Sequence, residues 1–346
     1  MQPHVITLTR LRTQQQGFAL VLALWVLSLL TIMAGSFALN IKRESAVIAS
    51  VKNSAEAHAL AETGLTIASL MLLNPDEKKR WRADGSVYQI TDAGLLNKDD
   101  AEVRIRMISE NGKIDINKAE QKLLAALLAH SPIQDEHEQT KIVSAIMDWR
   151  DEDDLLNIDG AEADEYKDAG LKYKPRNKPF QTLGELQMVL GMTPELYQWL
   201  TPLITVYSGQ ANVNARLATK EVLRVLPDID EDMLDTYFKE RTDNINKGLP
   251  PPPLPFNGGT QSNNSQTSSA AGNQTLTIIA EAQLDDGSTA MIHAVIATGV
   301  EANSGQLYRV LEWQRNAINE DSLFAETLGA SAISDLLIPE YDEPKH

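Results

Sequence analysis

The feature that most constrains this chain is a long uncharged stretch near its N-terminus. No charged residue occurs from Phe18 to Leu39, and most positions there are apolar. Arg10 and Arg12 precede the stretch, and Lys42 and Arg43 follow it. As a helix that rises about 1.5 Å per residue, the stretch is long enough to cross a hydrocarbon core of about 30 Å. The sequence therefore predicts a membrane-spanning helix that carries the rest of the protein.

Two interpretations compete for the residues before this stretch. A secretory signal peptide would be cut after its apolar region, but that region is too long here and no Ala-x-Ala site ends it. The other interpretation places the cut before the apolar region, between Gly17 and Phe18. A short basic leader that ends in Gly and is followed by Phe and a long apolar segment is typical of type IV prepilins. We favour this layout over an uncleaved ordinary membrane anchor.

The helical pattern continues beyond the membrane segment. Good helix formers are dense from residue 40 to residue 73, and Asn74-Pro75 is predicted to end the helix. A single helix over residues 18–73 would be roughly 84 Å long at about 1.5 Å per residue. No soluble domain needs a helix of that length, whereas a filament subunit does.

The charge and the cysteine content exclude several classes of function. The formal net charge of the 346 residues is -17, and the chain has no cysteine. An acidic surface repels phosphate backbones, so we expect no nucleic-acid binding. The helix-Gly-helix pattern from Thr182 to Val206 lacks basic neighbours and is interpreted as structural packing. Without cysteine, disulfides, thiolate metal sites and cysteine nucleophiles are ruled out.

Strand and helix patterns divide the remainder of the chain. Alternation of apolar and polar residues with period two predicts strands on both sides of a helical middle. The strands are expected at 86–91, 101–108, 113–117, 275–282, 290–297 and 306–313. The predicted fold is α+β, with the long N-terminal transmembrane helix, an antiparallel sheet and a large inserted all-α domain of the SAM-like type.

This fold implies seven divisions of the chain. They are a cleaved leader at 1–17, the helix at 18–73 with its transmembrane part at 18–39, a first part of the sheet domain at 74–117, the inserted helical domain at 118–205, a return segment at 206–248, a flexible Pro/Gly/Ser-rich loop at 249–274, and the C-terminal strands and tail at 275–346.

Local signals add expectations within these divisions. Thr182 and Glu185 have the spacing of a capping box, in which each side chain binds a backbone N–H at a helix start. Asn117 and Asn214 occupy matching places in a weak internal repeat, and we interpret both as caps of paired strand-to-helix entries. The acidic tail after Asp321 is expected to pack weakly, if at all.

The strongest candidate for a ligand site is a dense run of carboxylates in the helical middle. Hard oxygen ligands at such density suit calcium, although the spacing is not that of an EF-hand loop. The alternative is a solvated acidic loop with Arg150 and Lys167 as counter-charges. An acid–base pair such as Asp148 and Glu162 is the one arrangement that would suit an enzyme, and no motif supports it. The candidate calcium ligands are Asp148, Asp151, Asp153, Asp154, Asp159 and Glu162.

Together these features resemble the K-type minor pseudopilins of type II secretion systems, the GspK family. The resemblance covers most of the chain and rests on several motifs in the expected order. They are the segment from Gln16 to Leu27, Glu110-Asn111-Gly112-Lys113-Ile114-Asp115-Ile116-Asn117, Asp148-Trp149-Arg150-Asp151-Glu152-Asp153, Gly160-Ala161-Glu162, Tyr166, Thr182-Leu183-Gly184-Glu185-Leu186, Gly191-Met192 and Asn212-Val213-Asn214.

The resemblance gives roles to three residues at the N-terminus. It implies that a prepilin peptidase cuts after Gly17 and that the new N-terminus, Phe18, is methylated. Ordinary pilins carry Glu at the fifth mature position, where it neutralises the terminal ammonium of a neighbouring subunit. The fifth residue here is Leu22. An unpaired Glu in hydrocarbon is costly, so Leu suits a subunit that has no neighbour ahead of it.

The resemblance also implies a function and partners. The expected protein is a non-enzymatic tip subunit, anchored in the bacterial inner membrane with its soluble domain in the periplasm, that caps the pseudopilus and helps to initiate its assembly. Its expected partners are the I-type and J-type minor pseudopilins, the major pseudopilin, the inner-membrane assembly platform and the prepilin peptidase. Calcium is the expected ion of the helical domain. The alternatives are a minor pilin that caps an adhesive type IV pilus and a membrane-anchored hydrolase.

Overall fold

A computed structural model describes most of the chain, in two units that divide between Ala55 and Glu56. The described residues are 16–72, 74, 80–96, 101–227, 229–247, 249, 251–254, 274–299, 308–315, 322–324 and 331–332. The predicted leader before residue 16, Pro75 and nearly all of the Pro/Gly/Ser-rich loop lie outside the described residues.

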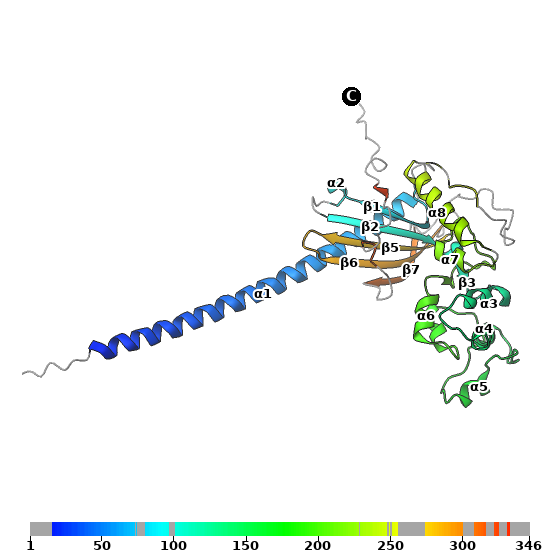
Figure 1. Ribbon diagram of the computed structural model, residues 1–346, viewed down its shortest axis with the longest axis horizontal. Helices are drawn as coiled ribbons and strands as arrows, with labels where there is room; N and C mark the ends of the chain where they lie inside the picture. Colours follow the sequence, from blue (N-terminus) through cyan, green and yellow to red (C-terminus); the bar gives the residue numbers. More distant parts are fainter. Residues whose placement is uncertain are drawn as a thin grey trace, which may run out of the picture. The chain divides into compact units, whose positions relative to one another are not determined.

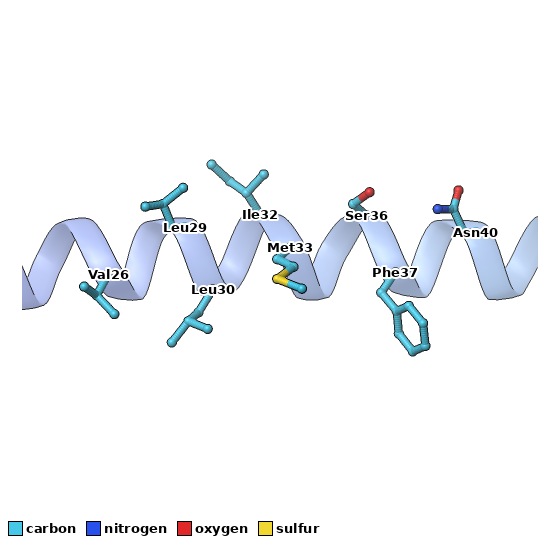
Figure 2. Close-up of a pocket in the computed structure, with 8 residues that line it drawn as sticks. All are labelled: Val26, Leu29, Leu30, Ile32, Met33, Ser36, Phe37 and Asn40. Atoms are coloured by element: carbon cyan, nitrogen blue, oxygen red, sulfur yellow. The ribbon is translucent and has the colours of Figure 1, made fainter.

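The first unit consists of the N-terminal part of helix α1. This helix runs from Gln16 to Leu72 over 57 residues, which confirms the long helix expected at 18–73. It is the one helix among the described residues that is long and apolar enough to cross a membrane. Figure 2 shows the labelled side chains between Val26 and Asn40 directed outward from the helix, and the shallow depression that they line is no enclosed cavity. Large apolar side chains such as Ile32, which is 69% exposed, need lipid or other helices around them.

A sheet forms one half of the second unit (Figure 1). Its order is β7-β6-β5-β2-β1-β8, and all neighbours are antiparallel except β8, which runs parallel to β1. The strands predicted at 86–91, 101–108, 275–282, 290–297 and 306–313 are confirmed. The strands of this sheet are β1 (Asp84–Ile90), β2 (Ala101–Ser109), β5 (Thr275–Leu284), β6 (Thr289–Thr298), β7 (Tyr308–Arg315) and β8 (Ser331–Ala332).

The alternation in β2 explains how this sheet gains its core. Val103, Ile105 and Met107 point to one face and are fully buried, together with residues of the C-terminal part of α1. Gly64 allows the helix to lie close to the sheet, because a Cβ atom there would be 2.7 Å from Cγ1 of Val103. The C-terminal part of α1 is therefore a core element of the sheet domain.

The helical half has a core of its own. It is built mainly by helices inserted between β2 and β5, as predicted, with one short parallel pair of strands, β3 and β4, among them. The same core includes Ile114 before the predicted domain of 118–205, and Val222, Leu223 and Leu234 after it. The return segment therefore packs as part of the helical domain.

The remaining elements are α2, which lies between β1 and β2, and the elements of the inserted part, of which α4 and α8 are the longest. They are α2 (Ala93–Leu96), the 3-10 helix η1 (Glu110–Gly112), β3 (Ile114–Asp115), α3 (Gln121–Ala129), α4 (Glu136–Arg150), α5 (Ala163–Asp168), the 3-10 helix η2 (Leu183–Met188), α6 (Pro194–Leu200), β4 (Ile204–Thr205), α7 (Lys220–Arg224) and α8 (Glu231–Asn246).

Three local predictions about caps were wrong. The Thr182 side chain makes no capping hydrogen bond, because the segment forms a 3-10 helix and Glu185 pairs with Arg176 at 2.9 Å instead. Asn117 caps no helix. Its amide exchanges two hydrogen bonds with the backbone of Phe180, at 2.7 and 2.9 Å.

Asn214 likewise stabilises a turn and caps no helix. Its Oδ1 accepts from the backbone N–H of Arg216, whereas the cap of α7 is Thr219. The internal repeat also fails as a structural repeat, because β3 pairs with β4 at Ile204–Thr205 and the segment around Asn214 forms no strand.

The described part of the tail packs more tightly than expected. Leu323 is 2% exposed, and its backbone N–H donates to a Glu281 carboxylate oxygen at 2.5 Å. The Arg104 guanidinium lies 4.6 Å from the centre of the Phe324 ring. Favourable side-chain contacts on the sheet thus fix this short segment in spite of the acidic composition around it.

Two buried ion pairs join the sheet to the helical core. Lys113 pairs with Glu110 at 2.8 Å at the start of the insertion. Arg241 of α8 pairs with Asp84 of β1 at 3.2 Å and also donates to the backbone oxygen of Ala218 at 3.3 Å. Removing one partner of a buried pair leaves an uncompensated charge, so both pairs fix the junction strongly.

Candidate functional site

The candidate site is the loop that follows α4, and Asp148 anchors it from the last turn of that helix. Asp148 is fully buried, and both of its carboxylate oxygens are occupied. One accepts from the backbone N–H of Ala161 at 2.7 Å, and the other accepts from the backbone and side-chain amides of Asn157. Gly160 permits this arrangement, because a Cβ atom there would collide with an Asp148 carboxylate oxygen.

Further contacts hold the backbone of the loop in place. Ser144 on α4 donates to the backbone oxygen of Ile158 at 2.8 Å. The side-chain amide of Asn177 donates to the backbone oxygen of Asp153 at 2.6 Å and to the carboxylate of Asp154 at 2.9 Å. The loop is thus tied to α4 on one side and to Asn177 on the other.

The predicted ligand residues divide into buried and exposed groups. Glu162 is only 7% exposed and Asp151 is half-buried, whereas Asp153, Asp154 and Asp159 are exposed to solvent. Asp153 uses one carboxylate oxygen to accept from the backbone N–H of Leu155 at 2.9 Å. The structure therefore brings the carboxylates to one loop but gives Asp148 a structural role at its base.

Two of these carboxylates lie in an unfavourable environment. Oδ1 of Asp151 is buried and has no hydrogen-bond partner. The buried carboxylate of Glu162 meets only the backbone at the start of α5, where it forms a capping box with Glu165, and the side chain of Asn177. Burial, followed by the nearby charges of Asp148, Asp151 and Asp154, raises the pKa of Glu162 to about 7. Burial, followed by the charges of Asp148 and Asp153, raises the pKa of Asp151 to about 6. A cation would stabilise the ionised form of both groups.

Arg150 supplies only part of the missing positive charge. Its guanidinium donates to the backbone oxygens of Ile116 and Ala119, at 2.5 and 2.6 Å. It lowers the pKa of Asp151, but the effect is smaller than that of burial. The predicted counter-charge therefore serves mainly to attach α4 to the β3 region.

Calcium prefers carboxylate and other hard oxygen ligands, which are the side chains gathered in this loop. In the part of the chain that the structure describes, however, no three His, Cys, Asp or Glu side chains lie in an arrangement that could hold a metal ion. Amide oxygens can complete calcium coordination, and Oδ1 of Asn177 is buried here without a partner. Glu162, Asp151 and Asn177 stay the candidates for holding an ion after a local rearrangement, with Asp153, Asp154 and Asp159 nearby in sequence.

Sequence reasoning missed Asn177 and Ser144. Asn177 lies in a stretch of ordinary polar residues, well after the acidic run, and no local pattern distinguishes it. Its backbone φ of 51° is a sign of a fixed conformation, but that angle is visible only in the structure.

The N-terminal residues with predicted processing roles all lie on α1. Gly17 and Phe18 are in its first turn, and the Phe18 side chain is 76% exposed. Leu22 is 56% exposed on the same helix. The cleavage after Gly17 and the methylation of Phe18 stay predictions.

Comparisons with known proteins address the identity of the chain. The family model described as "Type II secretion system (T2SS), protein K" matches residues 101–209, which span β2, the candidate site and β4. A type II secretion system protein K of Klebsiella pneumoniae is 24% identical over 220 residues, 58% of this chain and 66% of that protein. Over these matched regions the chain is similar to the type II secretion system protein K family. The resemblance noted from the sequence motifs is thereby confirmed.

Similarity to a second protein K and to one solved structure is more limited. The protein K of Dickeya chrysanthemi is 30% identical over 114 residues, 31% of each chain. The matched regions thus cover just under two thirds of the Klebsiella protein and about a third of the Dickeya protein. A chain in the crystal structure of the GspK-GspI-GspJ complex from enterotoxigenic Escherichia coli has a TM-score of 0.48 and 15% identity, with 80% of this chain and 99% of that chain covered.

Proposed function

We propose that this protein is a K-type minor pseudopilin, a non-enzymatic subunit that is anchored in the inner membrane and takes part in type II secretion. The observation that carries the proposal is the family match over residues 101–209, which includes the candidate site and most of the helical domain. The long apolar α1 supports a single-pass membrane anchor. The charge of -17 and the sealed position of Asp148 favour an assembly role over a nucleic-acid-binding or hydrolytic one.

We place this subunit at the tip of the pseudopilus. A subunit with no neighbour ahead of it has no terminal ammonium to meet within the membrane, and Leu22 stands where ordinary pilins carry Glu. The large helical domain would also obstruct the addition of a subunit above it. Both features support a capping subunit that helps to start assembly of the pseudopilus.

The proposed partners follow from the family. The complex from enterotoxigenic Escherichia coli contains GspK together with GspI and GspJ. We propose I-type and J-type minor pseudopilins as direct partners here, with the major pseudopilin and the assembly platform in the same pathway. The prepilin peptidase would act once, at the bond between Gly17 and Phe18.

Calcium is the proposed ion of the acidic loop. It would supply the positive charge that the buried carboxylates of Glu162 and Asp151 lack. Asn177 and Asp148 would hold the loop in the conformation that presents those carboxylates. Calcium thus has a structural role in this proposal, and no chemical reaction is assigned to it.

Complementation tests the proposed function. Cells that lack their own K-type pseudopilin but retain the rest of a type II system would receive this chain together with its cognate I-type and J-type subunits. We expect restored export and co-isolation of the three pseudopilins from detergent-solubilised membranes. Co-isolation of the three pseudopilins without export would show that they assemble with one another but do not work with the host secretion apparatus. The absence of both co-isolation and export would reject the proposed function.

A shortened chain tests the capping role separately. If export and formation of the tip complex survive deletion of residues 118–205, the helical domain does not cap the pseudopilus. A circular-dichroism spectrum and a protease digest of the shortened chain show whether the sheet domain still folds.

A further inference from the structure

The loop between α4 and α5 displays three large apolar side chains to solvent. Leu155, Leu156 and Ile158 are 75%, 53% and 89% exposed, and they lie within four consecutive positions. Single exposed apolar residues are ordinary on protein surfaces, whereas a group of them indicates an interaction site. We call these three residues the apolar tip.

The backbone that carries the apolar tip is held firmly. Hydrogen bonds hold it at Leu155, Asn157 and Ile158, through the Asp153 carboxylate, the Asn157 side chain and the Ile158 backbone oxygen, and after the three residues at Ala161. A flexible loop could turn its apolar side chains inward, but these contacts fix the backbone while the side chains stay outside. The loop is therefore pre-organised for binding, which lowers the entropy that a partner must overcome.

The charge around the apolar tip selects the kind of partner. Residues 151–159 contain five carboxylates and no Lys, Arg or His. Anionic lipid headgroups would be repelled by such a loop, and so would a second copy of this chain, with its net charge of -17. A basic surface would be attracted to it.

We infer that the apolar tip is a docking element for another protein, which receives Leu155, Leu156 and Ile158 in an apolar pocket rimmed by Lys or Arg side chains. This surface goes beyond the proposed function, because the proposed position at the end of the pseudopilus assigns no partner to Leu155, Leu156 or Ile158. Glu152, an exposed carboxylate that is no candidate calcium ligand, lies beside the apolar tip in sequence and would face the basic rim.

Photo-crosslinking in intact cells tests the inference. A photo-reactive amino acid replaces Leu156 in the full chain, in cells that make the complete secretion apparatus and its exported proteins. Met233 on α8 is the control position, because it is also apolar and 50% exposed. The adduct is identified by mass spectrometry, and the crosslinked residue is located on the structure of the captured protein.

The expected result has three parts. The adduct forms at Leu156 with one protein, and the crosslinked residue lies in an apolar pocket with Lys or Arg at its rim. Ile158→Ser lowers its yield about tenfold, as expected for loss of a central contact, whereas Met233→Ser does not. Glu152→Lys also lowers the yield of the adduct. High salt lowers the yield for the chain that retains Glu152, because it screens the attraction to the basic rim.

Other results would overturn the inference. These are a lipid adduct, a yield no higher than at Met233, a contact surface without basic side chains, and an adduct that survives Ile158→Ser. Because all the altered side chains are exposed, unchanged thermal unfolding of each variant confirms that a loss of yield reflects binding.

Discussion

The ammonium group of Lys113 lies 2.8 Å from Oε1 of Glu110, and both side chains are buried where the sheet gives way to the helical domain. Glu110 also accepts hydrogen bonds from Thr277 on β5, at 2.6 Å, and from Thr205 on β4. One carboxylate therefore connects the sheet core with the helical core.

We expect Lys113→Met to destabilise the protein by about 3–5 kcal/mol, because the carboxylate of Glu110 would stay buried without its counter-charge. Denaturant unfolding of the detergent-solubilised chain measures the change. Lys220→Met is the matched control, because its partner Asp235 is exposed and the pair at 2.6 Å is screened by solvent. An equal loss in the free energy of unfolding for the two variants would show that the buried pair contributes no more to stability than the exposed pair.

Gly160→Ala tests the close approach between the loop and α4. The new methyl group would overlap the Asp148 carboxylate, so the loop must move. We expect a loss of about 1–3 kcal/mol in the free energy of unfolding, as is typical of overpacking. Gly184→Ala is the control, because the nearest atom to its Cβ position is 3.7 Å away. Equal stability of Gly160→Ala and the parent would contradict the structure of the loop.

The raised pKa of Glu162 predicts how stability depends on pH in the absence of calcium. Its pKa is about 7 in the folded protein against an ordinary value of 4.5, so the unfolded chain loses this proton first. The contribution to stability is present below about pH 4.5 and is lost as the pH rises through about 7. Thermal unfolding in chelator between pH 5 and 8 should show this loss, and Glu162→Gln should reduce it.

Added calcium should restore stability above pH 7 in the parent chain, because ion binding favours the ionised carboxylates. It should do so much less in Glu162→Gln. In a variant whose other four tryptophans are replaced by Phe, the fluorescence of Trp149, which is buried one residue after Asp148, offers a second signal. Magnesium serves as the control ion, since it requires a tighter octahedral site. If calcium leaves the unfolding temperature of the parent chain unchanged at every pH, the loop does not bind calcium.

Leu22→Glu tests the proposed place of this subunit at the tip. An unpaired carboxylate at this depth is unfavourable, and the tip subunit has no neighbouring ammonium ahead to neutralise it. We expect the variant to insert in the membrane but to enter the complex with the I-type and J-type subunits poorly, with reduced export. Leu22→Met is the control for the size of the side chain. Normal export by Leu22→Glu would argue against the tip position.

The sequence determined the framework of this protein because the signals for it are local. The uncharged run from Phe18 to Leu39 specifies an apolar helix long enough to cross a membrane, and the period-two pattern in Ala101–Ser109 specifies a half-buried strand. The acidic run also indicated a candidate site, because carboxylates so close in the chain fall in one loop, and calcium binding there stays a prediction. The order of the motifs along the chain was sufficient to indicate the family.

The tertiary structure decided what each polar side chain does. The spacing of Thr182 and Glu185 matched a capping box, but Arg176 competes for the carboxylate of Glu185. Asp148 looked like one ligand among several, and its burial beside Gly160 made it the anchor of the loop. Such roles depend on partners that are distant in the chain and on burial away from water. A local sequence pattern contains no information about these two factors.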